Sequence, residues 1–73
     1  MDKKHLFEEL SRLETEFINL CKEQKKVIEK LEDNISNAEM FKNGIAKFSE
    51  YNKKIEKNRA ELLNIVQEYN GIE

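Results

Sequence analysis

The stretch DNISNAEMFKNG, residues 33–44, decides the fold, because it is either a bend between two helices or the polar middle of one long rod. Within it, Ser36-Asn37-Ala38-Glu39 has the form of a capping box, in which Ser36 caps the N–H of Glu39 at the start of a helix. Asn34, just before the box, can take the left-handed conformation that ends a helix. The stretch therefore predicts a turn, followed by a second helix that contains Gly44 at a cost of about 1 kcal/mol relative to alanine.

On both sides of this stretch, apolar residues recur at alternating steps of four and three residues, which is the spacing of one face of a helix. Period-2 strands do not fit it, so the fold class is all-α. The positions in this series, which we call the predicted seam, are Leu6, Leu10, Leu13, Phe17, Leu20, Gln24, Val27, Leu31, Asn34, Ala38, Phe41, Ile45, Phe48, Asn52, Ile55, Arg59, Leu62, Val66, Tyr69 and Glu73.

The seam continues in phase through the turn, so a hairpin and a rod must be separated by the pairing of its polar members. Folding the chain about Ser36 pairs residues whose numbers sum to about 72, and each polar seam residue then meets a large apolar one, for example Arg59 opposite Leu13. In a parallel rod, Arg59 would face its own copy, and two buried arginines repel. The hairpin is therefore favoured, and a long parallel coiled-coil rod is the alternative.

We predict one domain over residues 1–73, an antiparallel two-helix coiled-coil hairpin with helices over residues 3–32 and 37–70 and a turn over residues 33–36. Asp2 is the expected cap of the first helix, and Gly71 is expected to follow the end of the second. Because helices of this length gain little from propensity alone, packing must hold them. The residues expected to do so are Leu6, Leu10, Leu13, Phe17, Leu20, Ile55, Leu62 and Val66.

A second set of apolar residues flanks the seam on one side. Phe7, Cys21, Ile28 and Ile35 share one flanking position of the first helix, and Leu63 has the same position in the second. Two helices alone cannot cover such a strip, which favours packing against a partner protein or against a second hairpin in a four-helix bundle. The predicted partner-binding residues are therefore Phe7, Cys21, Ile28 and Leu63. A wide seam that simply fills a two-helix core is the alternative. The opposite flank, which includes Tyr51 and Ile65, is expected to be wetter.

Composition limits the chemistry that the chain can perform. The chain has 73 residues and a net charge of -2, with one cysteine and one histidine, so it can form neither an internal disulfide nor a closed metal site. A two-helix hairpin also offers no concave pocket for acid–base work. We expect no enzymatic activity, no catalytic residue, no metal and no cofactor. Without a signal peptide or membrane-spanning run, the expected location is the cytoplasm, with no membrane partner.

Lysines on both helices provide an alternative function. Lys22, Lys26 and Lys30 stand four residues apart, and Lys53, Lys54 and Lys57 cluster at a similar height. Such a belt could hold nucleic-acid phosphates, but glutamates interleave with it and no aromatic or arginine row accompanies it. The favoured hypothesis is a non-enzymatic interaction module, such as an adaptor, a chaperone-like small subunit or an inhibitor. A nucleic-acid-binding bundle is the alternative.

Two short strings, LFEELSRLE at residues 6–14 and YNKKIEK at residues 51–57, resemble the small helical subunit of bacterial exodeoxyribonuclease VII. The Gly-x-Leu-Ser-Leu-Glu-Glu segment expected between them is missing. The length and hairpin form also resemble the small two-helix co-chaperones of type III secretion systems, where only the architecture matches. Neither resemblance covers a specific motif, so no functional residue is carried over.

Overall fold

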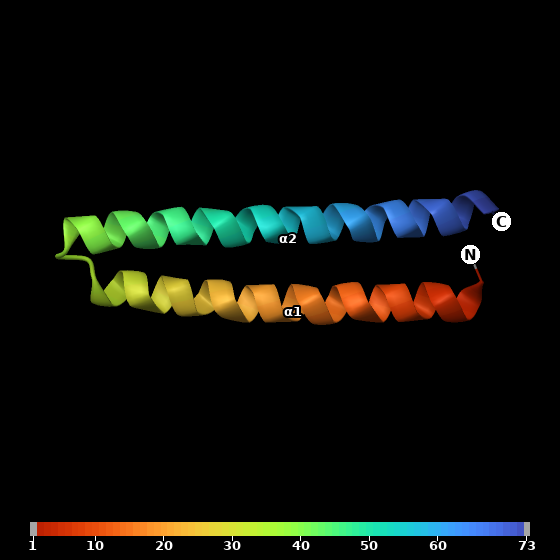
Figure 1. Cartoon of the computed structure of the whole chain (residues 1–73), viewed down its shortest axis with the longest axis horizontal. Helices are drawn as coiled ribbons and strands as arrows, with labels where there is room; N and C mark the ends of the chain where they lie inside the picture. Colours follow the sequence, from red (N-terminus) through yellow and green to blue (C-terminus); the bar gives the residue numbers. More distant parts are fainter. Residues whose placement is uncertain (1, 73) are drawn as a thin grey trace.

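The protein is an antiparallel helical hairpin, as predicted from the sequence. A computed structural model describes residues 2–72, in which helix α1 (Lys3–Asp33) is followed by a turn and by helix α2 (Ala38–Ile72) (Figure 1). The hairpin measures 55 by 16 by 10 Å between its Cα atoms. The all-α class is confirmed, and the alternative of one long rod is wrong, because the chain turns back at residues 34–37.

Helix α1 begins as its sequence predicts. Asp2 has extended backbone dihedrals, and its carboxylate accepts a hydrogen bond of 2.7 Å from the N–H of His5. This bond satisfies one of the free N–H groups in the first turn. The negative charge of Asp2 also interacts favourably with the positive end of the helix dipole.

The turn uses different residues from those predicted. Asn34 has a φ of -114°, so it is not left-handed, and its side chain instead donates a 2.7 Å hydrogen bond to the carbonyl of Lys30. The cap of α2 is Asn37, whose side-chain oxygen accepts a 3.1 Å hydrogen bond from the N–H of Met40. The predicted capping by Ser36 is wrong, because asparagine caps as well as serine does and the helix begins one residue later. Gly71 lies inside α2 and does not follow it.

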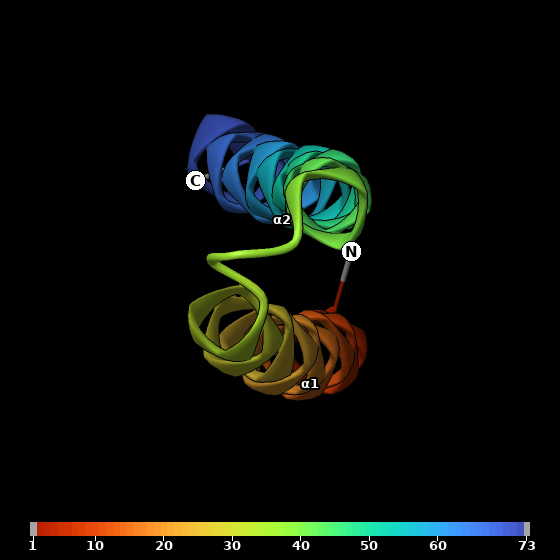
Figure 2. The same ribbon diagram turned by 90° about the vertical axis from the view of Figure 1, so that its left-hand side faces the viewer.

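The packed side of α1 is the predicted one. Its most buried residues, Leu13 and Val27, belong to the predicted seam, and so do the half-buried residues Leu10, Phe17 and Leu20. Within residues 2–72 no further layer covers the pair, as the end-on view shows (Figure 2). The core of this protein is therefore a single line of contacts between two helices.

The packed side of α2 is rotated from the predicted seam by about half of the 100° between consecutive residues. Phe48, Ile55 and Leu62 face α1 as expected and Tyr69 is half-buried, but the seam positions that alternate with Phe48, Ile55 and Leu62 are each replaced by the preceding residue. Thus Gly44, Tyr51, Asn58 and Ile65 face α1 in place of Ile45, Asn52, Arg59 and Val66. The predictions that Val66 holds the hairpin and that Tyr51 and Ile65 lie on a wet flank are wrong: Ile45 is 47% exposed and Val66 is 39% exposed.

A conflict between two adjacent polar residues explains this rotation. Asn58 is only 1% exposed, and its amide donates a 3.0 Å hydrogen bond to the carbonyl of Leu13. Arg59, predicted to lie opposite Leu13, instead reaches outward and forms a 2.8 Å ion pair with Glu14. A buried asparagine with a hydrogen bond costs little, whereas a buried arginine costs several kcal/mol of desolvation. The rotation therefore buries Asn58, whose burial costs less free energy than that of Arg59.

Gly44 permits the helices to approach closely near the turn. A Cβ atom at this position would lie 2.6 Å from Cδ2 of Leu31, closer than carbon atoms approach without displacement. The leucine therefore packs onto the bare backbone of α2. Close packing against Leu31 gives the interior glycine a function that offsets its low helix propensity.

Candidate interaction face

The rotation of α2 adds apolar residues to the flank that the sequence predicts to bind a partner. Ile45 and Val66, excluded from the seam, directly follow the packed residues Gly44 and Ile65. On α1, Phe7 and Ile28 likewise directly follow the packed residues Leu6 and Val27. In an antiparallel pair these positions lie on one side of both helices. We call this side the apolar face, and it consists of Phe7, Ile18, Cys21, Ile28, Ile35, Ile45, Leu63 and Val66.

The register across the pair is fixed by three polar contacts. Asn58 bonds to Leu13, Arg59 to Glu14 and Arg12 to Glu61, so the residue numbers of facing pairs sum to 71 or 73. With this register, Phe7 lies at the height of Val66, and Ile28 lies at the height of Ile45. The apolar face therefore has one cluster near the chain ends and another near the turn.

Large side chains on this face are well exposed. Phe7 is 69% exposed, Ile28 is 51% exposed and Leu63 is 56% exposed, while Cys21 is half-buried. Solvent exposure of single apolar residues is ordinary, but clusters of them along one side of a helix pair are typical of an interaction surface.

A charged pair divides the apolar face between its two clusters. The guanidinium of Arg59 bonds to Glu14 at 2.8 Å and to the side-chain oxygen of Asn58 at 2.7 and 3.0 Å. It also stacks over the ring of Phe17, 3.8 Å from the ring centroid. These contacts hold Arg59 and Glu14 across the groove between the helices, where a cation above an aromatic ring is stabilised by the ring electrons.

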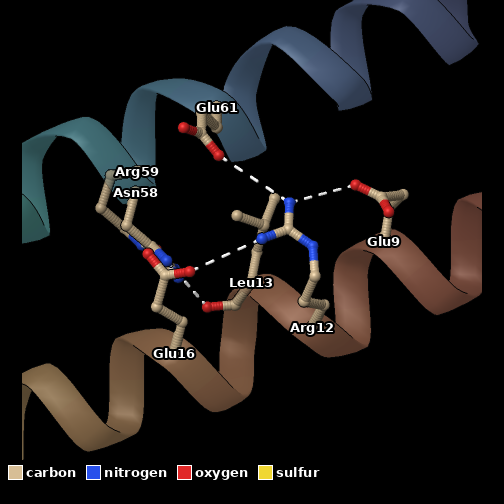
Figure 3. A network of polar contacts seen from close by, with 7 residues as sticks. All are labelled: Glu9, Arg12, Leu13, Glu16, Asn58, Arg59 and Glu61. Atoms are coloured by element: carbon tan, nitrogen blue, oxygen red, sulfur yellow. Dashed lines mark hydrogen bonds and ion pairs between the residues drawn. The ribbon is translucent and has the colours of Figure 1, made fainter.

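The opposite side of the hairpin is charged. Arg12 forms ion pairs with Glu9 at 3.1 Å and Glu16 at 3.6 Å on its own helix, and with Glu61 of α2 at 3.9 Å (Figure 3). The hydrogen bond to Glu9 and then the surrounding negative charges raise the pKa of Arg12 above its ordinary value. The arginine is therefore charged at every physiological pH, and exposed pairs of this kind contribute little to stability.

The lysine belt does not form an unbroken positive surface. Lys26 is paired with Glu23 at 3.1 Å, and Lys54 lies over the ring of Tyr51 at 5.4 Å. The hollow beside Lys22, Lys25 and Lys26, about 370 Å³ in volume, is also lined by Glu23 and Glu29. Carboxylates within the belt weaken the field that phosphate binding needs.

The remaining features of the surface offer little for chemistry. A hollow of about 340 Å³ lies near the turn between Leu31, Gly44 and Tyr51, with lysines and glutamates at its edge. Among residues 2–72, no cluster of histidine, cysteine or carboxylate side chains could hold a metal ion. Within the same residues, neither helix is long and apolar enough to cross a membrane.

The structure brings the four residues predicted to bind a partner onto one side of the hairpin. Sequence reasoning missed three members of the apolar face: Ile18, Ile45 and Val66. Ile18 could have been found, because it stands three residues before Cys21 and so neighbours it on the helix surface. Ile45 and Val66 were assigned to the seam, so they could be found only with the correct rotation of α2.

Comparisons of this chain with protein-family models, with characterised proteins and with solved structures found no match. The properties of the hairpin itself must therefore carry the functional argument.

Proposed function

We propose that this protein is a non-enzymatic interaction module, of the adaptor, chaperone-like subunit or inhibitor type, that binds a helical protein surface through its apolar face. The observation that carries this proposal is the row of exposed apolar side chains, in which Phe7, Ile28 and Leu63 each keep more than half of their surface in water. Covering them with another helical surface removes that apolar area from water, at roughly 25 cal/mol for each Å².

The asymmetry between the two sides supports the proposal. One side carries the ion pairs of Arg12 and the other carries the apolar face, although within residues 2–72 no further element covers either side (Figure 2). A hairpin that acted only as a spacer would need no such difference. Charged residues on one side keep the assembly soluble, while apolar residues on the other bind.

A pair of substitutions of equal charge tests this proposal. Ile28→Glu places a carboxylate on the apolar face, and we expect it to abolish association while leaving the chain helical, because the carboxylate would have to be buried without a partner. Asn43→Glu adds the same charge on the other side of α2 and should change nothing. Light scattering measures the assembly, and circular dichroism measures the helix content.

A photoreactive residue makes the same comparison in the native host. Placed at Ile18, it should cross-link to a discrete product that contains this chain and either a second copy or another protein. Placed at Asn43, it should not. Equal cross-linking from both positions, or unchanged assembly of the Ile28→Glu variant, would refute a specific role for the apolar face.

A further inference from the structure

We infer that the partner of the apolar face is a second copy of this chain, packed face to face with both turns at the same end to form a four-helix bundle. This inference rests on the proposed function, since it names the occupant of the same face. It is carried by the size of the face, by its arrangement of apolar clusters and by the position of its one ion pair.

The apolar face is large enough for a stable dimer. The side of the hairpin that carries it measures 55 by 16 Å between Cα atoms, with the charged pair and the other polar residues on that side included. The corresponding area is roughly 900 Å², compared with about 800 Å² buried on each partner in an interface of standard size. A shorter helix or a single peptide would leave part of this length uncovered.

A two-fold axis parallel to the helices places α1 of one copy over α2 of the other at equal height. Phe7 then lies over Val66 of the second copy, and Ile28 lies over Ile45 of the second copy. Each apolar cluster therefore meets an apolar cluster, and the same contacts form twice because the interface is isologous. All four helices are antiparallel to their neighbours, as in ordinary four-helix bundles.

The charged pair in the middle of the face is complementary to itself under this symmetry. Glu14 and Arg59 lie side by side, joined at 2.8 Å. The two-fold axis exchanges the two helices, so Glu14 faces Arg59 of the second copy and Arg59 faces Glu14 of the second copy. Four charges of alternating sign then meet at the centre, which gives each buried group two opposite partners.

The rim of the face is complementary in the same way. Glu32 on α1 and Lys42 on α2 flank the face, and their residue numbers place them at nearly equal height in the register set by the polar contacts. In the symmetric pair, each Glu32 is therefore near Lys42 of the second copy. Such rim charges mainly select the partner and its orientation.

An arrangement with the turns at opposite ends lacks these matches. It packs α1 on α1 of the second copy, so Glu14 faces either Glu14 of the second copy or an uncharged residue, depending on the offset. The first option brings like charges together, and the second buries the pair without further partners. Only the arrangement with both turns at one end gives the ion pair a complementary surface.

Distance measurement between labelled turns tests the orientation. The Ser36→Cys variant, made with Cys21→Ala, carries one spin label in the exposed turn of each copy. With both turns at one end, pulsed electron paramagnetic resonance should give a distance of about 20 Å, because packed helices are about 10 Å apart. Turns at opposite ends would give a distance near the 55 Å length of the hairpin and would overturn the inference.

Charge exchange tests the central contact. The Glu14→Arg variant has four positive charges at the centre of its homodimer and the Arg59→Glu variant has four negative ones, so each should dimerise at least about tenfold more weakly than the wild type. Mixing the two should restore dimers as heterodimers, because the two positive side chains of one copy then face the two negative side chains of the other. Sedimentation of the mixture measures this, and no preference for heterodimers would overturn the inference.

The outcomes separate this inference from the proposed function. If the wild type stays monomeric at its highest soluble concentration but the photoreactive residue at position 18 cross-links another host protein, the inference that the partner is a second copy is wrong. The proposal that the protein is an interaction module is then retained. If the wild type is monomeric and Ile18 gives no specific product, both fail. A dimer with a short distance between turns and recovery on mixing supports both.

Discussion

The rotation of α2 about its axis can be reversed by exchanging the roles of two adjacent residues. In the native chain Asn58 is buried against Leu13, while Arg59 lies outside the seam. The double variant Asn58→Lys and Arg59→Leu makes the native rotation bury a lysine and makes the alternative rotation bury a leucine. We expect α2 to turn by about 50°, half of the 100° between consecutive residues, so that Ile45 and Val66 enter the seam while Phe48, Ile55 and Leu62 stay in it.

The size of the effect follows from the burial of the residues that would exchange places. Ile45 and Val66, 47% and 39% exposed, would each gain roughly 1 kcal/mol on becoming buried. Tyr51 and Ile65 would lose a similar amount, so the apolar terms nearly cancel. The residues at positions 58 and 59 therefore determine which rotation of α2 is more stable. Burying the unpaired lysine of the double variant costs several kcal/mol, whereas the lost hydrogen bond of Asn58 is worth about 1 kcal/mol.

Thiol reactivity measures the rotation directly. With Cys21→Ala as background, a single cysteine replaces either Ile65 or Val66, and the alkylation rate is followed at a concentration at which the chain is monomeric. In the native background the thiol at position 66 should react faster. In the double variant the thiol at position 65 should react faster than the thiol at position 66. The ratio of the two alkylation rates should be at least about tenfold if the two rotations differ by more than 1.4 kcal/mol in free energy. If position 65 remains the slower one, while circular dichroism shows full helix content, then the Asn58 and Arg59 pair does not set the rotation.

Three further predictions concern stability, measured by urea unfolding followed by circular dichroism. Asn37→Ala should lower the free energy of unfolding by about 1 kcal/mol because it removes the cap of α2, and the matched change Ser36→Ala should have almost no effect; equal losses would contradict this assignment. Gln24→Leu should raise the free energy of unfolding by about 2 kcal/mol, because the buried side-chain nitrogen of Gln24 has no hydrogen-bond partner among residues 2–72; a less stable variant would show that this amide is satisfied. Gly44→Ala should stabilise the Leu31→Ala variant by about 1 kcal/mol but not the wild type, since only the native leucine obstructs the added methyl group; additive effects would rule out the close contact.

The hairpin and the packed side of α1 could be predicted from the sequence because both depend on strong, local signals. An apolar series with steps of four and three residues identifies helices, and the helix-ending and capping residues of the stretch 33–44 predict the turn between them. The N-terminal cap at Asp2 followed in the same way. The turn was harder, since Ser36 and Asn37 are equally good caps and the periodicity does not choose between neighbours.

The rotation of α2 could not be predicted from periodicity. The predicted and the observed seam share every second position, differ by one residue at the others and are almost equally apolar. The predicted one contains Ile45 and Val66, and the observed one contains Tyr51 and Ile65. The difference lies in the cost of burying Arg59, which a count of apolar positions does not include. The residues of the apolar face on α1 were identified correctly because the rotation of α1 was right, and those on α2 were mostly missed because its rotation was wrong.

Arg59 therefore links the stability of the hairpin to its binding surface. Because Arg59 stays out of the seam, Ile45 and Val66 are displaced onto the apolar face, where the proposed second copy would cover them. In the double variant these two residues would be buried within the hairpin, and Ala46 and Gln67, which directly follow them, would lie on the face. We therefore expect that variant to be a more stable monomer that no longer associates. If it unfolds at a higher urea concentration yet assembles as the wild type does, measured by light scattering, then Ile45 and Val66 do not belong to the interface, and association depends on α1 alone.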